Sequence, residues 1–312
     1  MRLAGAARAA SARRWTPIMM AVARTEGFVD VGDGRVWYEC AGSGDRTLLL
    51  LHGGPGGNSE DLSPFLELAA LGYRVVRYDQ LGSWRSDQPD DLSLWQVPRF
   101  VTEVERVRQA LDLGRMHLMG QSWGAFLAIE YALHHGEHLR SLVLASGAAS
   151  TKECVAGMNA WRRELPEETQ SIMARYEASR EYDHPEYLAA VEMLYRRNFC
   201  RVWPYPEPLA IAMQHTAMPV YTTMWGPNEF TCTGNLLEFD RTDRLGEIDV
   251  PTLITVGEFD EVHPSCARTL HAGIPNSELV IFADGGHVVL LEQHDRYRQI
   301  LERFLERVES AS

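Results

Sequence analysis

Residues 120–124 read Gly-Gln-Ser-Trp-Gly, a Gly-x-Ser-x-Gly pattern from which the rest of this chain can be interpreted. A mostly apolar run at 116–119 precedes the pattern, and apolar residues with helical spacing follow it at 126–133. Between a strand and a helix, such a serine occupies a sharp, strained turn called a nucleophile elbow. The flanking glycines let the strand and the helix approach closely because they carry no side chain. Ser122 is therefore the predicted nucleophile, provided that a base and an acid accompany it.

The composition is that of a globular protein large enough to bury an extensive core. Of its 312 residues, 45% are hydrophobic and 23% are charged, which suits one large α/β domain with an insertion, or two domains. The formal net charge of −13 argues against nucleic acid and anionic membranes as partners, because both are negatively charged. No apolar run approaches the roughly 18 residues of a membrane-spanning helix. The oligomeric state stays open.

Cysteines are scattered along the chain without a Cys-x-x-Cys pair. Their odd number and their spacing favour reduced thiols in a cytoplasmic protein over a disulfide framework or a zinc site. The sequence contains no cluster of metal ligands and no cofactor-binding loop, so we expect neither a metal nor a cofactor. The five cysteines are Cys40, Cys154, Cys200, Cys232 and Cys266.

The first 24 residues differ in composition from the rest of the chain. Residues 1–24 are rich in alanine and arginine and contain no acidic residue. Transit peptides have this composition, and so does sequence translated from a region upstream of the true start. Because Met19 and Met20 can serve as later starts, we favour the second explanation. We expect 1–24 to be a disordered extension or no part of the mature protein.

Strands and helices alternate along most of the sequence. Residues 27–31 and 35–41 alternate in polarity like a hairpin around the turn at 32–34, and 47–51 form a continuous apolar run typical of a strand covered on both faces. Such alternation predicts an α/β fold with a doubly wound, mostly parallel sheet. Further strands are predicted at 73–78, 116–119, 139–145, 252–256 and 279–282, and helices at 62–71, 99–111, 126–133, 265–272 and 297–308.

The alternation stops in the middle of the chain. Residues 146–244 predict several helices rich in aromatic residues and methionine, and strands return after them. Helices inserted between two halves of one sheet are typical of a lid, and the return of the sheet makes an independent second domain the weaker alternative. We expect the first half of the core at 25–145, a helical cap at 146–244 and the second half of the core at 245–312.

A serine hydroxyl is a poor nucleophile until a base removes its proton, so a histidine and an orienting acid are needed. In hydrolases with an elbow of this kind the acid and the histidine follow the serine in that order, on loops after late strands. His287 lies just after the last predicted strand, behind two glycines that let the loop reach across the site. It is preferred over His263, His271 and His294, which lie in a loop or on predicted helices.

The acid is expected on the loop after the preceding strand. Residues 257–261 read Gly-Glu-Phe-Asp-Glu and offer Glu258, Asp260 and Glu261. Asp260 is preferred because its short side chain is less mobile than that of either glutamate. A solvated acidic loop is the alternative.

An oxyanion hole requires two backbone N–H donors that point to one place. The residue after the nucleophile, Trp123, can supply one of them. The other is expected from Gly54 in the glycine-rich loop 52–56, because residues without Cβ atoms allow the backbone to come close to a carbonyl. The loop, the elbow, the late acid and the late histidine occur in the order that this chemistry requires.

Five blocks of sequence carry a resemblance to a known family. With them the chain resembles the proline iminopeptidase (prolyl aminopeptidase) family of α/β-hydrolases, which also includes L-amino-acid and prolinamide amidases. The match runs from about Gly27 to the C-terminus, and its most specific block lies in the cap, where general α/β-hydrolases share little. The blocks are His52-Gly53-Gly54-Pro55-Gly56, Asp79-Gln80-Leu81-Gly82, Gly120-Gln121-Ser122-Trp123-Gly124, Trp225-Gly226-Pro227-Asn228-Glu229-Phe230 and Val256-Gly257-Glu258-Phe259-Asp260-Glu261.

The resemblance implies an α/β-hydrolase fold with an inserted cap, and it implies two binding residues besides the catalytic ones. Glu229 in the cap and Glu261 beside the acid are implied as receptors for the free amino group of the substrate. Two carboxylates can recognise the positive charge near the scissile carbonyl, although Glu229 could also be an ordinary solvated residue. The implied catalytic residues are Ser122, Asp260 and His287, with Gly54 and Trp123 as oxyanion donors.

The predicted function is that of a serine aminopeptidase that releases N-terminal proline from small peptides through an acyl-enzyme. An amidase acting on prolinamide or another amino-acid amide is the nearest alternative, and an ester or lactone hydrolase of secondary metabolism is a more distant one. One departure from the family concerns the residue after Ser83, where a glycine is usual and Trp84 stands here. Its indole leaves the shape of the substrate pocket open.

Overall fold

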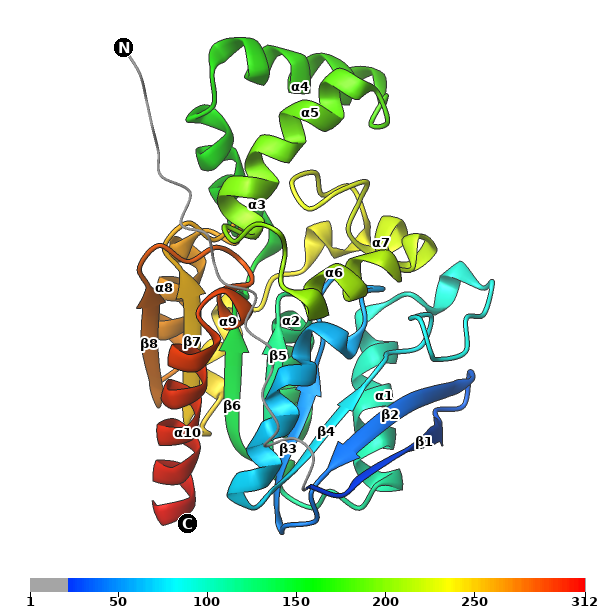
Figure 1. The fold of residues 1–312 in the computed structure, drawn as a ribbon, viewed down its shortest axis with the longest axis vertical. Coiled ribbons are helices and arrows are strands. Elements are labelled where there is room, and N and C mark those ends of the chain that lie inside the picture. The colour runs from blue at the N-terminus through cyan, green and yellow to red at the C-terminus, as the bar shows by residue number, and fades with distance from the viewer. Residues whose placement is uncertain (1–21, 312) are drawn as a thin grey trace.

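The computed structural model describes residues 22–311, so most of the predicted N-terminal extension lies outside the described residues. Its centre is an eight-stranded sheet of order β1-β2-β4-β3-β5-β6-β7-β8 (Figure 1). Only β2 pairs antiparallel, with β1 and β4, and the other pairs in this part of the chain are parallel. The predicted doubly wound, mostly parallel sheet is confirmed. The strands are β1 Arg24–Asp30, β2 Arg35–Ala41, β3 Arg46–Leu51, β4 Tyr73–Tyr78, β5 Met116–Gln121, β6 Leu139–Ala145, β7 Thr252–Gly257 and β8 Ser277–Phe282.

Helices cover both faces of the sheet, and further helices lie over the carboxyl ends of its central strands (Figure 1). Among the described residues, no helix combines the length and the apolar character that crossing a membrane requires. The longer helices are η2 Ser59–Leu71, α1 Val97–Ala110, α2 Trp123–His135, α3 Thr151–Arg163, α4 Glu167–Ser179, α5 Pro185–Leu194, α6 Glu207–Gln214, α7 Met218–Met224, α8 Pro264–Gly273 and α10 His294–Ala311. The short ones are η3 Leu92–Leu94, η4 Gly136–His138, η5 Tyr195–Phe199, η6 Asn235–Glu238, η7 Thr242–Glu247 and α9 Val289–Glu292.

The surroundings of strand β3 explain the continuous apolar run at residues 47–51. Leu49 and Leu51 pack in the cluster that contains α1, α2 and α8 side chains. Leu48 and Leu50 point the other way, into the cluster formed with η2 and α10. Since successive side chains of a strand point to opposite faces, a strand covered on both faces needs apolar residues at every position. All four leucines are fully buried.

The helix predicted at 62–71 forms with a different geometry. It is a 3₁₀-helix, η2, and it begins three residues earlier, at Ser59, where the side chain of Asn58 accepts a hydrogen bond from the N–H of Glu60. Pro64 lies inside this helix and has no N–H to donate to the backbone. An apolar period alone does not distinguish the two helix types.

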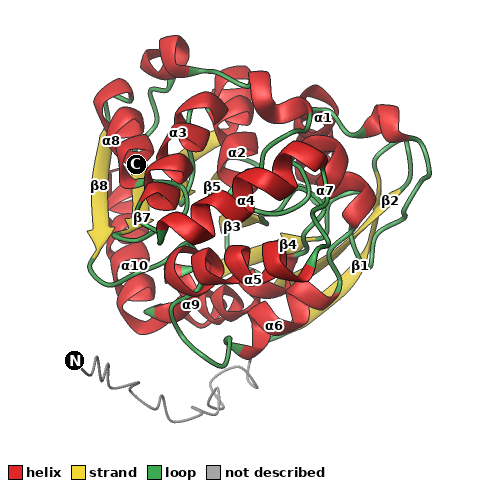
Figure 2. Cartoon of the chain, turned by 90° about the horizontal axis from the view of Figure 1, so that it is seen from above, coloured by secondary structure: helices red, strands yellow, loops and turns green. Residues whose placement is uncertain are grey.

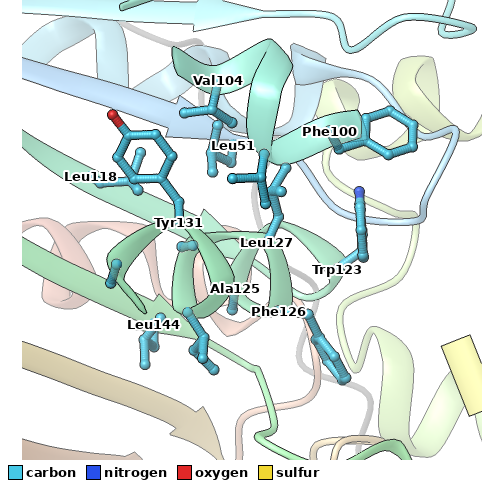
Figure 3. Close-up of a cluster of buried hydrophobic side chains, with 14 of the residues drawn as sticks. Leu51, Phe100, Val104, Leu118, Trp123, Ala125, Phe126, Leu127, Tyr131 and Leu144 are labelled. Atoms are coloured by element: carbon cyan, nitrogen blue, oxygen red, sulfur yellow. The ribbon is translucent and has the colours of Figure 1, made fainter. Parts of the chain in front are cut away.

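Helix α2 carries the residue after Ser122 directly into the core. Trp123 and Leu127 lie on the side of α2 that faces Phe100 of α1, whereas Phe126 lies on the side toward Leu144 of β6 (Figure 3). The rings of Trp123 and Phe100 meet edge to face, with centroids 5.6 Å apart. Because α2 is packed on nearly all sides, the start of the helix and the turn before it are held in place.

Most of the segment 146–244, which we call the cap, lies over the carboxyl ends of the central strands (Figures 1 and 2). Its last residues run along α2, where Arg241 pairs with Glu130. Helices α3, α4 and α5 enclose a separate apolar cluster that includes Trp161, Met173 and Tyr187. Hydrogen bonds tie the cap to the glycine-rich loop: the N–H of Ala217 donates to the carbonyl of Gly56 over 2.7 Å. Ligands of open α/β sheets bind at this edge, so the cap covers the expected site.

We expect Gly124→Ala to destabilise the protein by about 3 kcal/mol or more, as overpacking of a tight backbone contact does. A Cβ atom at this position would lie 2.2 Å from the carbonyl oxygen of Leu51, which belongs to the backbone and cannot move away. The control is Gly136→Ala, where no atom lies within 4 Å of the new methyl group and the backbone is already helical.

Urea denaturation of both variants measures the effect. Gly136→Ala should leave stability unchanged or raise it by about 0.4–1 kcal/mol. Equal stability of the two variants would contradict the close approach of α2 and β3.

Candidate active site

Ser122 occupies the turn between β5 and α2 in a strained backbone conformation, with φ 55° and ψ −122°. Its N–H donates a hydrogen bond of 2.9 Å to the carbonyl of Ala145, which fixes the turn against β6. The two glycines are required by close approach, since a Cβ on Gly120 would lie 2.0 Å from the carbonyl oxygen of Gly124. Strain of this kind persists only where surrounding structure enforces it, and it is frequent at functional sites.

His287 and Asp260 form a buried pair. Nδ1 of His287 lies 2.7 Å from Oδ1 of Asp260, and both side chains are at most 2% exposed. Oδ1 of Asp260 also accepts a hydrogen bond from the N–H of Val262 over 2.9 Å. The carbonyl of His287 accepts a bond from the hydroxyl of Ser146. These contacts fix the imidazole ring and give it a defined orientation at the carboxyl edge of the sheet.

The competing histidines lie in other environments. His294 contacts Glu67, His271 contacts Ser277, and His263 caps the start of α8. The alternative acid Glu258 is exposed, and its carboxylate accepts a hydrogen bond from the N–H of Asp284.

The second ring nitrogen of His287 faces two polar side chains. Nε2 lies 3.3 Å from the amide nitrogen of Gln121 and 3.4 Å from Oε1 of Glu261. In the part of the chain that the structure describes, Ser122 and His287 share no hydrogen bond. Catalytic hydrogen bonds are often long before substrate binds, so this spacing does not argue against the pair.

Burial and charge act in opposite directions on His287. Burial by itself lowers the pKa of His287, but the carboxylates of Glu261 and Asp260 and the hydrogen bond to Asp260 raise it more, to about 10. The carboxylates around the ring thus favour its protonated form.

The predicted oxyanion donors line the same pocket as Ser122. Gly54 has φ 88°, a conformation that glycine adopts readily. Within residues 22–311, neither the N–H of Gly54 nor that of Trp123 donates a hydrogen bond to the protein. Both donors are thus available to an oxygen in the pocket.

Gln80 and His52 support these two donors. Oε1 of Gln80 accepts a hydrogen bond of 2.8 Å from the indole N–H of Trp123. The N–H of Gln80 donates to Nε2 of His52, and the side-chain amide of Gln80 donates to the carbonyl of His52. Burial lowers the pKa of His52, so its ring stays neutral and can accept this bond.

A small pocket lies beside Ser122. Its walls are mainly apolar, and its two carboxylates come from different parts of the chain, one from the cap and one from the core. Pockets of this character, apolar with few polar groups, are typical of small-molecule sites. The lining residues are Gly54, Pro55, Ser122, Trp123, Phe126, Met158, Trp225, Glu229, Leu236, Glu261 and Val262.

Glu229 and Glu261 line this pocket together, and each is fully buried next to the charge of the other. Two neighbouring buried carboxyl groups do not both ionise readily, so the pair holds a proton. Burial raises the pKa of Glu229, and burial together with the charges of Glu229 and Asp260 raises the pKa of Glu261 well above its usual range. Oε2 of Glu261 is buried and has no hydrogen-bond partner. The pair thus offers buried acceptors to a cation.

Residues that the sequence did not single out hold these groups. The indole N–H of Trp161 donates to the carbonyl of Asp260 over 2.7 Å. The carbonyl of Asn198, at the end of the π-turn η5, accepts the N–H of His287 over 2.8 Å. Tyr195 contacts the N–H of Glu229 through its hydroxyl. The cap therefore positions both the acid–histidine pair and the lid glutamate.

Trp84 does not line the pocket. Its ring stacks on that of His215, with centroids 4.1 Å apart, and the guanidinium of Arg85 lies 3.5 Å above its centroid. His215 follows α6, so the indole fills a contact between core and cap. The departure from the family pattern thus affects how the cap is seated, and not the lining of the pocket.

One group of described residues could hold a metal ion, and it lies away from this pocket. It consists of Glu105, His135 and His138, at the end of α2 opposite Ser122. Both carboxylate oxygens of Glu105 already accept hydrogen bonds from Arg108, and one accepts a further bond from Tyr131. The Arg108 charge lowers the attraction of this group for a cation.

Comparison with known proteins agrees with this geometry. Residues 46–293 match the family model of the alpha/beta hydrolase fold. A proline iminopeptidase of Saccharolobus solfataricus is 38% identical over 275 residues, which cover 88% of each chain. The crystal structure of a proline iminopeptidase of Mycobacterium smegmatis superposes with a TM-score of 0.86 at 32% identity, covering 92% of this chain and 99% of that one.

A second solved structure, that of VinJ, is similar to the same degree. It has a TM-score of 0.87 at 34% identity and covers 91% of this chain and 99% of its own. Identities and coverage of this size extend over the core and the cap together. The chain belongs to the proline iminopeptidase family of α/β-hydrolases and is an aminopeptidase-like hydrolase.

Proposed function

We propose that this chain is a serine aminopeptidase that releases N-terminal proline from small peptides. The observation that carries the proposal is the pair of carboxylates, Glu229 and Glu261, in the same pocket as Ser122. A substrate with a free amino terminus brings a positive charge to within one residue of its scissile carbonyl. The buried pair can receive that ammonium while the carbonyl lies at Ser122. Relatives named proline iminopeptidase support the assignment of proline.

The first half of the reaction forms an ester. Nε2 of His287 takes the hydroxyl proton of Ser122 while Oγ attacks the carbonyl carbon. Asp260 stabilises the resulting imidazolium through its bond to Nδ1. The charge that develops on the carbonyl oxygen is met by the free N–H groups of Gly54 and Trp123. When the C–N bond breaks, His287 gives the proton to the departing amine and prolyl-Ser122 remains.

The second half of the reaction hydrolyses this ester. His287 removes a proton from a water molecule, and the resulting hydroxide attacks the prolyl carbonyl carbon. The C–O bond to Ser122 breaks, and Oγ recovers its proton from His287. When the ester has been hydrolysed, the ammonium of proline is still bound to the two carboxylates. Release of proline therefore requires that water or a proton replace the ammonium there.

The pocket walls suit a small apolar ring. Phe126, Met158, Trp225 and Leu236 surround the space next to the two carboxylates. A pyrrolidine ring is apolar except at its nitrogen, so burial of its methylene groups against these side chains is favourable. The amine-binding glutamates close the pocket on the side where the N-terminus of the substrate lies. A peptide with further residues before the scissile bond therefore does not fit. We infer that the enzyme removes one residue at a time.

Replacing Glu229 by glutamine should lower kcat/KM for prolyl-p-nitroanilide by roughly ten- to 150-fold, the value of one charge-assisted hydrogen bond of about 1.5–3 kcal/mol. The amide keeps the shape of the side chain but loses the charge that attracts the ammonium. The same substitution should hardly change the hydrolysis of a neutral p-nitrophenyl ester, whose recognition needs no cation.

The control is Glu168→Gln, which makes the same change on an exposed position of cap helix α4. It should leave both rates at the wild-type value. If Glu229→Gln slowed the ester and the anilide equally, Glu229 would be a structural residue and the proposed amine site would be wrong.

A further inference from the structure

The carboxylate of Glu261 lies between the amine site and the catalytic base. Its Oε1 is 3.4 Å from Nε2 of His287, the nitrogen that has to accept the proton of Ser122. Its other oxygen is buried and has no hydrogen-bond partner among the described residues, and Glu229 lines the same pocket. One side chain thus contacts both the group that recognises the substrate and the group that starts the chemistry.

An imidazole ring that faces a carboxylate at each of its nitrogens is most stable with a proton on both. Nδ1 donates to Asp260 and Nε2 faces Glu261, so both nitrogens act as donors in this arrangement. A doubly protonated ring cannot remove a proton from Ser122, and no hydrogen bond joins these two residues anywhere in the described structure. The base is therefore occupied as long as the Glu229–Glu261 pair, which holds one proton and one negative charge, lies beside Nε2.

We propose that Glu261 is a positioning residue that couples substrate recognition to catalysis: it retains a proton on His287 until a substrate ammonium occupies the Glu229–Glu261 pair. This inference rests on the proposed function, because it assigns the ammonium to that pair. The ammonium donates its N–H groups to both carboxylates and neutralises the charge that faces the imidazole ring. Nε2 then becomes free to accept the hydroxyl proton of Ser122.

The protons balance in this exchange. The entering ammonium replaces the proton that Glu229 and Glu261 share, and it removes the attraction that holds a second proton on His287. Both protons leave to the solvent, and no covalent bond to carbon, oxygen or nitrogen of the substrate changes. When the ammonium leaves with the product, the carboxylates and the ring take up protons again. Non-cationic molecules that enter the pocket do not release the base.

Gln121 is placed to support both states of the ring. Its side-chain amide lies 3.3 Å from Nε2 of His287. An amide can donate through its nitrogen to a neutral ring or, after a half turn, accept through its oxygen from a protonated one. A half turn of the Gln121 amide can therefore match either protonation state of Nε2 until the hydroxyl of Ser122 takes that position.

The charged surroundings of His287 favour the protonated ring. Burial opposes the charge, but Glu261, Asp260 and Glu229 raise the pKa of His287 to about 10. Neutral ring is required for catalysis, so activity without a bound cation should rise as the pH increases toward this value. The charged and titratable groups around the ring are Asp260 and Glu261 after β7, Glu229 and Tyr195 in the cap, and Glu292 with Arg201 behind the His287 loop.

The test uses the wild-type enzyme with p-nitrophenyl acetate, a neutral ester, near neutral pH. Ethylammonium chloride is added over the concentration range in which it competes with prolyl-p-nitroanilide, and potassium chloride at equal ionic strength is the control. We expect ethylammonium to accelerate ester hydrolysis at least about tenfold, which corresponds to a fall of one unit in the pKa of the base. Potassium chloride should have no such effect.

A second measurement compares pH profiles of ester hydrolysis in wild type and Glu261→Gln. The glutamine removes the charge that raises the pKa of His287, so the rising limb should move to lower pH by at least about one unit and ethylammonium should no longer activate. Glu258→Gln makes the same change on an exposed residue of the same loop. It should keep the wild-type profile and the activation.

The outcomes separate this inference from the proposed function. If ethylammonium inhibits hydrolysis of prolyl-p-nitroanilide but does not accelerate hydrolysis of the ester, the proposed coupling is wrong. The proposed amine site is not contradicted by that result. An unchanged pH profile in Glu261→Gln overturns it as well. Prolyl-p-nitroanilide hydrolysis that is insensitive to ethylammonium and to Glu229→Gln contradicts the amine site itself, and with it the proposed function.

Discussion

Ser122→Ala is expected to lower kcat for prolyl-p-nitroanilide by roughly four to six orders of magnitude, as removal of the nucleophile does in serine hydrolases. No other side chain in the pocket can form the ester, since its remaining polar groups are backbone amides and two carboxylates. The variant should fold normally, because the hydroxyl of Ser122 forms no hydrogen bond on which the turn depends and the N–H bond to Ala145 is kept. A thermal melt of the variant checks this point.

The same measurement extends to His287. His287→Ala should cost about as much as Ser122→Ala, and the double variant should lose little more, because the residues of a triad act as a unit. Ser171→Ala, on the exposed side of α4, is the control and should keep full activity. If Ser122→Ala retained about a tenth of the wild-type rate, the assignment of the nucleophile would be wrong.

Much of the core could be predicted because each buried strand leaves a direct signal in the sequence. Residues 73–78 and 139–145 were predicted to the residue, since short segments rich in aliphatic and aromatic residues between turns admit few alternatives. The geometry of η2 could not be predicted, because its apolar spacing fits an α-helix equally well. What decides between them is Pro64 and the packing of the whole segment against the sheet.

The residues predicted for the site come together because the order of the strands fixes them. The loops after β5, β7 and β8 end at the same edge of a parallel sheet, so Ser122, Asp260 and His287 converge there. Local sequence around each loop was sufficient to propose them as site residues. The supporting residues have no such signal, because they depend on contacts between the cap and the core.

Trp161 illustrates this limit. It is 99 positions away from Asp260, whose carbonyl accepts its indole N–H. Its sequence context indicates only an aromatic residue on a cap helix, and aromatic residues are common there. The same holds for Trp84, whose position after a conspicuous motif suggested the pocket, whereas the structure places it against His215. Contacts of this kind depend on the position of the cap relative to the core, and a local sequence pattern does not determine that position.

Blocking the substrate amine should have the second-largest effect. N-acetylation removes the positive charge and leaves Glu229 and Glu261 facing an uncharged group in a buried pocket. Two charge-assisted hydrogen bonds of about 1.5–3 kcal/mol each correspond to a loss of roughly 10²- to 10⁴-fold in kcat/KM. The neutral amide also leaves Glu261 next to His287.

The central claim is that this hydrolase acts on a free amino-terminal residue held by two carboxylates. The direct measurement is the ratio of kcat/KM for prolyl-p-nitroanilide to that for N-acetyl-prolyl-p-nitroanilide, with the same leaving group and the same enzyme preparation. We predict a ratio of at least about 10² from the loss of these charge-assisted bonds, and a ratio that falls markedly in Glu229→Gln. A ratio near unity in the wild-type enzyme would contradict the account and would indicate an esterase or a general amidase.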